Sequence, residues 1–158
     1  MKIGVVSDTH SKDVPKEMLK DFKGVDFIIH VGDFCSLDDL KVLTKIKEVK
    51  GVYGNMDDEG VCKKFPRRQI IKVDEINIGL YHGHGPAKRI LESVQIEFEK
   101  DIVDVIIFGH SHQPMNEVID NVLYFNPGSP NDTIVAPFCS YGILEINGDQ
   151  IKGRIIKV

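Results

Sequence analysis

Five short motifs in this chain of 158 residues carry side chains of the kinds that bind metal ions in proteins. Each motif follows a run of apolar residues and supplies carboxylate, imidazole or amide groups. Because no thiolate lies among them, a tetrahedral structural zinc site is not expected. Mixed oxygen and nitrogen ligands suit Mn²⁺, Fe, Co, Ni or Zn in open coordination. In chain order the motifs are Asp8-x-His10, Gly32-Asp33, Gly54-Asn55, His82-Gly83-His84 and Gly109-His110-x-His112.

The motifs offer more ligands than one ion can use. They fit two divalent ions about 3.5–4 Å apart, with a carboxylate such as Asp33 placed to bridge them. The glycines beside the ligands allow the backbone to leave a strand sharply. If the strands continue through the motifs, Asp8 and His10 point the same way, as do His110 and His112, so each pair can face one cluster. The candidate metal ligands are Asp8, His10, Asp33, Asn55, His82, His110 and His112.

The elements that must position these residues alternate between strand and helix in the first third of the chain. Apolar runs at 3–6, 26–31 and 49–53 predict buried strands. Helices are expected to begin near Pro15 and near Ser36, the second with a capping box. This pattern predicts parallel strands with right-handed crossovers, whose ligands lie beyond the carboxyl ends of the strands. The first three motifs fall at those ends.

The middle of the chain contributes the other two motifs. Residues 56–69 are polar and predict a solvated loop, with phosphate gathering by its basic side chains as the lesser alternative. Runs at 70–73 and 76–81 predict a hairpin whose second strand ends at His82. Pro86 is expected to begin a helix that leads to the last motif strand. The basic side chains are Lys63, Lys64, Arg67 and Arg68.

After His112 the pattern changes to short strands without helices between them. Asn147-Gly148 is a strong hairpin signal within this part. Consecutive antiparallel strands here predict a second sheet packed on the first, with helices outside the two sheets. The predicted strands occupy 118–119, 122–125, 133–136, 141–146 and 151–158.

Composition limits the classes of protein that the chain can be. Its length predicts one domain over 1–158, and the net charge of -4 argues against general nucleic-acid or anionic-membrane binding. Its three cysteines form no CxxC pair, the N-terminus lacks a signal-peptide pattern, and no apolar run approaches the roughly 20 residues of a membrane span. We therefore expect a cytoplasmic protein with free thiols and no membrane association.

The ordered set of five motifs resembles the calcineurin-like metallophosphoesterase superfamily. The chain length and the Asn126-Pro127-Gly128-Ser129 turn are similar to its small single-domain prokaryotic phosphodiesterase branch, and the resemblance runs from Ile3 to about Ile146. It implies an α/β fold, a four-layer α/β/β/α sandwich of two packed mixed β-sheets flanked by helices.

The resemblance also implies how the ligands are shared between two divalent ions, with Mn²⁺ first and Ni, Fe, Co or Zn as alternatives. The first ion would be held by Asp8, His10, Asp33 and His112. The second ion, bridged to the first by Asp33, would be held by Asp33, Asn55, His82 and His110. A hydroxide shared between the ions would attack phosphorus in line.

One position departs from the superfamily pattern. Where the family has Gly-Asn-His-Asp or Gly-Asn-His-Glu, this chain has Gly54-Asn55-Met56-Asp57, and a thioether cannot donate a proton to the leaving group. His84 or Asp57 could take this part, and nothing in the sequence places either one. The residues expected to act in catalysis are Asp33, Asn55 and His84.

The leading hypothesis is a metal-dependent phosphodiesterase that acts on a small or activated phosphodiester. A phosphomonoesterase of the same fold ranks lower because of Met56. The alternative from another class is a non-catalytic metal-binding scaffold resembling a retromer subunit, which shares the fold but has degenerate ligands, whereas none is lost here. The sequence leaves a homo-oligomer open. Outside the motifs, His30 is expected to be a packed core histidine and Asn126 a turn residue, with support of the site as its lesser alternative.

Overall fold

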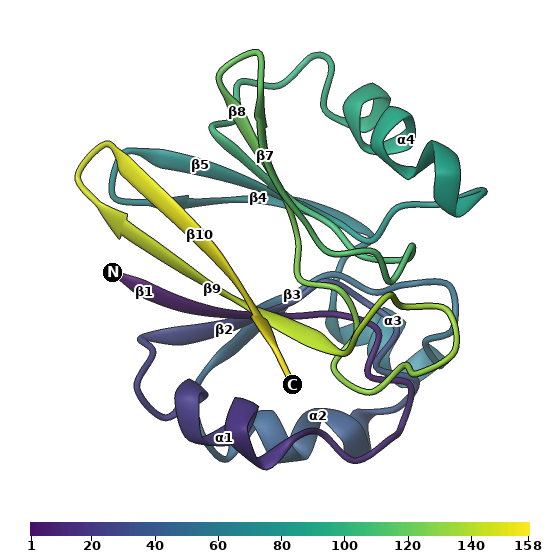
Figure 1. The fold of residues 1–158 in the computed structure, drawn as a ribbon. Coiled ribbons are helices and arrows are strands. Elements are labelled where there is room, and N and C mark those ends of the chain that lie inside the picture. The colour runs from purple at the N-terminus through teal and green to yellow at the C-terminus, as the bar shows by residue number, and fades with distance from the viewer.

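Two five-stranded β-sheets pack against each other in the computed structural model, which describes residues 1–158 (Figure 1). The strands of the first sheet are β1 (Lys2–Val6), β2 (Phe27–His30), β3 (Val49–Gly51), β9 (Ser140–Asn147) and β10 (Gln150–Lys157). The strands of the second sheet are β4 (Arg68–Val73), β5 (Ile76–Tyr81), β6 (Val105–Ile107), β7 (Met115–Ile119) and β8 (Val122–Asn126). Their orders are β10-β9-β1-β2-β3 and β4-β5-β6-β8-β7.

Both sheets are mixed. The predicted parallel strands are confirmed, since β1 pairs with β2 and β2 with β3 in parallel, and β9 and β10 add antiparallel strands on the other side of β1. The predicted hairpins β4–β5 and β9–β10 are also confirmed, the second turning through Gly148 at φ 62. In the second sheet, β6 runs parallel to both of its neighbours.

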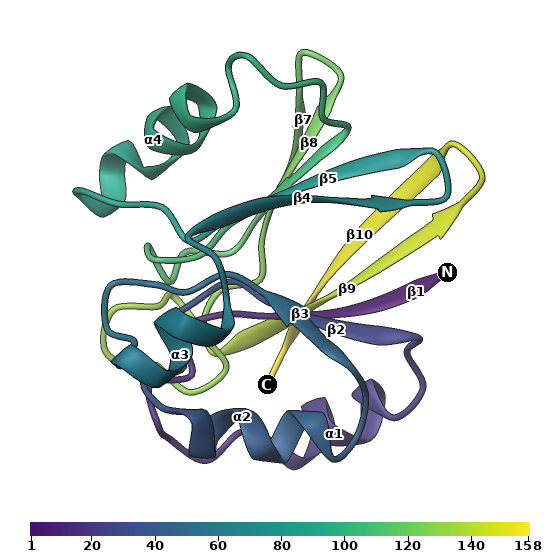
Figure 2. The ribbon, with the colours of Figure 1, turned by 180° about the vertical axis from the view of Figure 1, so that it is seen from behind.

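Helices cover the outer face of each sheet and complete four layers. Helices α1 (Lys16–Phe22) and α2 (Leu37–Thr44) lie on the first sheet, and α4 (Ile90–Glu97) lies on the second, preceded by a short 3-10 helix, η1 (Ala87–Arg89) (Figure 1 and Figure 2). The capping box predicted at Ser36 is present at the start of α2. The expected α/β/β/α sandwich is therefore confirmed. None of the helices is long and apolar enough to cross a membrane.

The core between the sheets comes from the inward sides of both. Its main cluster has 16 buried hydrophobic residues, including Val5 and Ile29 from the first sheet and Leu80 and Ile107 from the second. Full burial of such a side chain stabilises the fold by roughly 1.5–3 kcal/mol. Smaller clusters join α1 and α2 to the first sheet and α4 to the second. The packed strands thus give rigid ends from which the motif loops start.

Three parts of the predicted arrangement were wrong. The strands after His112 do not form a sheet of their own, because β7 and β8 join the hairpin β4–β5 and β6, while β9 pairs with β1. Residues 133–136 form no strand, because amides of this segment bind the carboxylate of Asp132 instead. Residues 56–69 contain a helix, α3 (Glu59–Lys64), which Asp58 caps by accepting from the Val61 amide at 2.9 Å.

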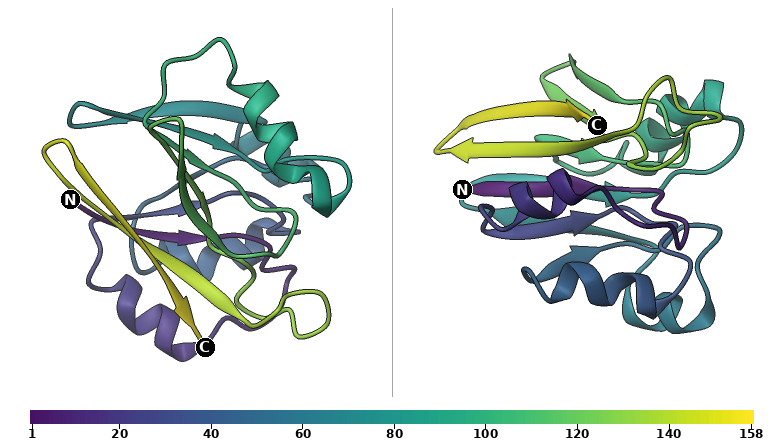
Figure 3. Two further views of the ribbon diagram at one scale, coloured as in Figure 1. Left: turned by 45° about the horizontal axis from the view of Figure 1, so that its top comes forward. Right: turned by 60° about the horizontal axis from the view of Figure 1, so that its bottom comes forward.

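The motif loops gather at one end of the sandwich. Figure 3 shows the N-terminus and the β9–β10 hairpin at one end of the sheets and the long connecting loops at the other. The loops that follow β1, β2, β3, β5 and β6 carry the five motifs. Because parallel strands end on the same edge of a sheet, residues far apart in the chain meet at this end.

Candidate metal centre

The motif residues lie in tight turns and do not extend the strands. Strand β1 ends at Val6 and β6 ends at Ile107, before the motif side chains begin. Five candidate ligands have left-handed backbone: Asp8 (φ 56), His10 (φ 49), Asp33 (φ 58), His110 (φ 65) and His112 (φ 55). Such backbone costs about 1–3 kcal/mol at a non-glycine residue and is concentrated at functional sites. The condition that the strands continue through the motifs is therefore not met, and the turns determine which way the side chains point.

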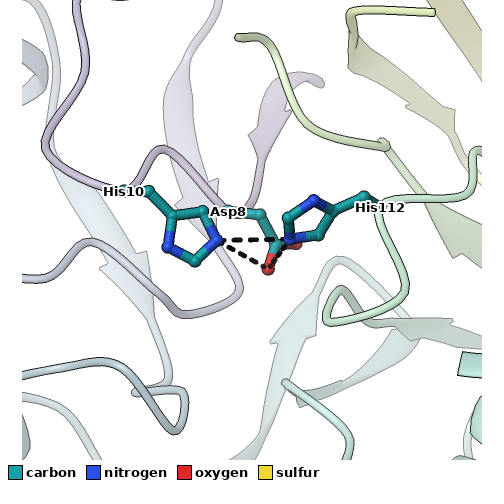
Figure 4. A group of neighbouring side chains, drawn as sticks. All are labelled: Asp8, His10 and His112. Carbon is teal, nitrogen blue, oxygen red and sulfur yellow. Dashed lines mark hydrogen bonds and ion pairs between the residues drawn. The ribbon is translucent and has the colours of Figure 1, made fainter. Parts of the chain in front are cut away.

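The turns bring five of the seven candidate ligands into two overlapping groups. Within each group, the ligand atoms lie within 4.8 Å of one another. Figure 4 shows the first group, in which Asp8 Oδ1 lies 3.3 Å from His112 Nε2 and 3.8 Å from His10 Nε2. The first group is Asp8, His10 and His112; the second is Asp8, Asp33 and His82.

Asp33 lies between the imidazoles of the two groups. Its Oδ2 is 3.8 Å from His10 Nε2 and 3.4 Å from His82 Nε2. Its other oxygen, Oδ1, accepts a hydrogen bond from the Met56 amide at 2.8 Å. One carboxylate oxygen is therefore fixed by the backbone while the other faces both groups, which is the arrangement that a bridging ligand needs.

Two histidines are held with Nδ1 bonded to the protein, which leaves Nε2 as the nitrogen available to a metal. The Nδ1–H of His82 donates to the Val31 carbonyl at 2.7 Å, and the Nδ1–H of His112 donates to the Asp132 carboxylate. Each ring therefore presents Nε2 to the carboxylates, and the partner of Nδ1 fixes its orientation.

Buried polar atoms without partners show that the residues fit a cation. Asp8 Oδ1 and His82 Nε2 are buried and make no hydrogen bond. A buried polar atom left without a partner costs about 1–3 kcal/mol, and more when it is charged. A divalent cation between the carboxylates and the imidazoles would satisfy both atoms.

The carboxylates and histidines shift one another's protonation. Burial raises the pKa of the Asp8 carboxyl, but its ion pair with His112 and the charge of His82 outweigh burial and hold the pKa below its usual value. Burial lowers the pKa of His82, but Asp33 and Asp8 outweigh it and raise the pKa to about 9. Burial also lowers the pKa of His112, but Asp8 and Asp132 outweigh burial and raise this pKa to about 9. Protons and cations therefore compete for these nitrogens.

The remaining two candidate ligands lie next to these groups and contact each other. Asn55 Oδ1 is 2.9 Å from His110 Nδ1, and His110 Nε2 is 2.8 Å from the Gly85 carbonyl. The His110 ring stands nearly perpendicular to the His82 ring, with 5.2 Å between their centres. The structure thus places Asn55 and His110 beside the second group but not within it.

The two residues considered in place of the missing histidine have different surroundings. Asp57 accepts from the amides of Asp33, Cys35 and Gly54 at 3.0, 2.7 and 2.7 Å, so both of its oxygens hold loops together. His84 is exposed, and its Nδ1 lies 2.8 Å from Tyr81 Oη and 2.9 Å from Ser93 Oγ. Of the two, only His84 has a side chain free to meet a ligand.

His30 is a core histidine, as expected. The Gly32 amide donates to its Nδ1 at 3.2 Å, so its Nε2–H donates to Thr9 Oγ1 at 3.1 Å. The ring stacks on Phe34 with 3.5 Å between centres, and burial lowers its pKa to about 3. His30 therefore stays neutral and supports the loop that carries the first motif.

The segment 126–132 supports the ligand loops, and the sequence reasoning singled out only its first residue for this. Asn126 is a turn residue, as expected, since its Oδ1 accepts from the Gly128 amide at 2.9 Å, and its Nδ2 also donates to the Gly109 carbonyl beside the last motif at 3.0 Å. Ser129 Oγ donates to the Asp8 carbonyl at 2.8 Å. The Asp132 carboxylate accepts a hydrogen bond from the His112 ring and is held in place by the amides of residues 134 and 135. The sequence signal that could have pointed to Ser129 and Asp132 was the run of polar residues directly after a buried strand.

Asp132 gives a prediction about metal affinity. Asp132→Asn is expected to weaken Mn²⁺ binding by about 10–100-fold. Without the negative charge of Asp132, the His112 ring is less basic and its orientation is less well fixed. Competition with a chelator at fixed pH measures this affinity. Asp149→Asn, the same change on the exposed β9–β10 turn, is the control. Equal affinities of the two variants would show that Asp132 does not support the metal centre.

The fold and the cluster define the class of protein, an α/β/β/α sandwich that gathers metal-ligating side chains at its strand ends. A model of the calcineurin-like phosphoesterase superfamily domain matches residues 1–149. The chain belongs to this superfamily.

Two relatives agree with this family, and a solved structure shares the fold. A probable metallophosphoesterase of Methanocaldococcus jannaschii, MJ0623, is 40% identical over 168 residues, covering 100% of this chain and 82% of its own. Phosphodiesterase MJ0936 of the same organism is 32% identical over 144 residues, covering 81% of this chain and 83% of its own. Vacuolar protein sorting 29 from Cryptosporidium parvum shares the fold, with a TM-score of 0.82, 21% identity, and coverage of 99% of this chain and 91% of its own.

Proposed function

We propose that this chain is a dinuclear-metal-dependent phosphodiesterase that hydrolyses a small or activated phosphodiester. The observation that carries the proposal is the pair of ligand groups that share Asp8 and meet at Asp33, with buried Asp8 Oδ1 and His82 Nε2 left without partners. The 32% identical relative named as a phosphodiesterase supports a diester as substrate.

In this proposal one ion would be held by Asp8, His10, Asp33 and His112, and the other by Asp33, Asn55, His82 and His110. Two divalent ions, with Mn²⁺ the first candidate and Ni, Fe, Co or Zn as alternatives, supply an activated water and neutralise phosphoryl charge when bound. Asp33 is assigned as the bridge. Asn55 and His110, which lie in contact beside His82, complete the second set. The proposed ligands are Asp8, His10, Asp33, Asn55, His82, His110 and His112.

We assign to His84 the role of giving a proton to the leaving group. As an imidazolium, the His84 ring can donate its Nδ1–H to Tyr81 Oη at 2.8 Å or to Ser93 Oγ at 2.9 Å. Its Nε2–H can then be given to a leaving oxygen, which leaves the ring neutral. Met56 is 57% exposed next to Asn55 and has no proton to give.

Hydrolysis of bis(p-nitrophenyl) phosphate tests the proposed function. Protein freed of metal with a chelator is expected to show only the buffer rate, and addition of Mn²⁺ or Ni²⁺ is expected to restore turnover at two ions per chain. The rate with p-nitrophenyl phosphate, a monoester, is expected to be lower. No metal-dependent turnover of the diester would reject the proposal.

Two other outcomes identify the alternatives. Faster turnover of the monoester than of the diester would indicate a phosphomonoesterase. Two bound ions without turnover of any ester in a broad panel, together with stable co-purification of a protein partner, would indicate a non-catalytic scaffold.

A further inference from the structure

A cleft beside the candidate metal centre has features of a binding site that the metal ligands do not explain. It has a volume of about 400 Å³ and includes Asn55 and His82 in its lining. Tyr53, Arg67 and Tyr81 also line it. A phosphoester held at the metal centre would therefore have one of its ester groups close to this cleft.

The Arg67 guanidinium is fixed in one orientation within the cleft. Its Nη1 donates to Glu97 Oε1 at 3.0 Å, and its Nη2 donates to Glu97 Oε2 at 2.9 Å and to Tyr81 Oη at 2.9 Å. Its Cζ lies 4.8 Å from the centre of the Tyr81 ring. Bidentate pairing and a cation–π contact together hold a guanidinium in place. The side chain is nevertheless 52% exposed, which leaves part of that plane open.

The charges around Arg67 favour a planar ligand over a second anion. Glu97 pairs with Arg67 through both carboxylate oxygens, so the positive charge is largely offset within the protein. What remains is a flat, weakly hydrated group whose Cζ lies over the Tyr81 ring at 4.8 Å from its centre. Guanidinium planes of this kind stack on aromatic rings and on nucleobases.

We propose that this cleft binds a planar aromatic ester group of the substrate, such as a nucleobase or an aryl ring, with Arg67 as the stacking surface. The proposal rests on the proposed function, since it names the class of phosphodiester that the metal centre would hydrolyse. It makes Arg67 a specificity-determining residue that contacts the substrate away from phosphorus.

The test measures binding of two matched ligands to the Mn²⁺-loaded protein by calorimetry. Phenylphosphonate and cyclohexylphosphonate carry rings of similar size, and only the first is planar. The wild type is expected to bind phenylphosphonate roughly tenfold more tightly, the effect of one good stacking contact. Arg67→Ala and Arg67→Lys are both expected to reduce this preference to about twofold or less, because an ammonium group keeps the charge but has no plane.

Lys64→Ala is the matched control, since it removes one positive charge from α3 outside the cleft. It is expected to keep the full preference for the phenyl ring. Equal binding of both ligands by the wild type, or an undiminished preference in Arg67→Lys, would overturn the proposal. Thermal unfolding checks that each variant is folded. If Arg67→Ala does not fold, the result is taken from Arg67→Lys alone.

Because binding is measured separately from turnover, the two proposals can fail separately. A preference for the phenyl ring that depends on Arg67, in a protein that hydrolyses no ester, supports the cleft and rejects the proposed function. Metal-dependent diester turnover without that preference rejects the cleft alone.

Discussion

Replacing Asp33 with asparagine is expected to lower metal-dependent diester turnover by about 10³-fold or more. Its Oδ2 lies 3.8 Å from His10 Nε2 and 3.4 Å from His82 Nε2, so both ligand groups lose the same charge at once. Charge stabilisation by bound metal is worth several kcal/mol in a transition state, and each 1.36 kcal/mol is about tenfold in rate. The number of metal ions per chain after gel filtration is expected to fall below that of the wild type, because both ions lose a ligand.

Asparagine is chosen because it keeps the support of the loop. Its side-chain oxygen can still accept from the Met56 amide, the bond that Asp33 Oδ1 makes at 2.8 Å. A loss of turnover in Asp33→Asn therefore reports the missing charge and not a displaced loop. Asp149→Asn, on an exposed turn, controls for the change of residue type. Two ions retained at wild-type affinity, with turnover within about tenfold of the wild type, would remove Asp33 from the role of bridging ligand.

The part of the fold that the sequence could predict is the part in which pairing follows chain order. Three apolar runs separated by helices led correctly to the parallel strands β1, β2 and β3. Periodicity says nothing about distant partners, so it could not show that β9 returns to pair with β1. The helix α3 was missed because it has six residues and buries only Val61, although Asp58 at its start was a readable cap.

The same distinction applies to the candidate site. Topology predicts that motifs at the ends of parallel strands meet, and the structure brings five of the candidate ligands together there. The left-handed turns at Asp8 and His112 depend on bonds between loops, such as the one from the Asp8 amide to the Gly32 carbonyl at 3.0 Å. The pairing of Asp132 with His112 likewise depends on the path of a loop that returns from β8. No local pattern contains that information.

Replacing His84 with glutamine is expected to slow hydrolysis according to how poor the leaving group is. General acid catalysis typically contributes about 10²–10⁴-fold, so a methyl or nucleoside ester with an alkoxide leaving group is expected to lose at least about 10²-fold in kcat. A p-nitrophenolate leaves without a proton, and its rate is expected to change by less than about threefold. Steady-state rates on the two kinds of diester measure the difference. Equal losses on both would show that His84 positions the substrate and gives no proton.

Tyr81→Phe tests the same assignment from the side of the hydrogen bond that orients the ring. The phenol oxygen lies 2.8 Å from His84 Nδ1, and its removal leaves Ser93 Oγ, at 2.9 Å, as the partner of that nitrogen. A smaller loss than in His84→Gln is therefore expected, again confined to poor leaving groups. A larger loss in Tyr81→Phe, present with both kinds of ester, would instead reflect the displacement of Arg67, which donates to the same oxygen at 2.9 Å.

Met56 allows the lost proton donor to be supplied from another position. Its side chain is 57% exposed beside Asn55, so a histidine there has room to reach a bound ester. Met56→His in the His84→Gln background is expected to raise the rate on esters with poor leaving groups roughly tenfold. The rate on p-nitrophenyl esters is expected to stay the same, because their leaving group needs no proton. If the histidine raises both rates equally, it acts by binding the phosphate, and position 56 does not lie on the leaving-group side. If it raises neither, the approach to the leaving oxygen is from the His84 side alone.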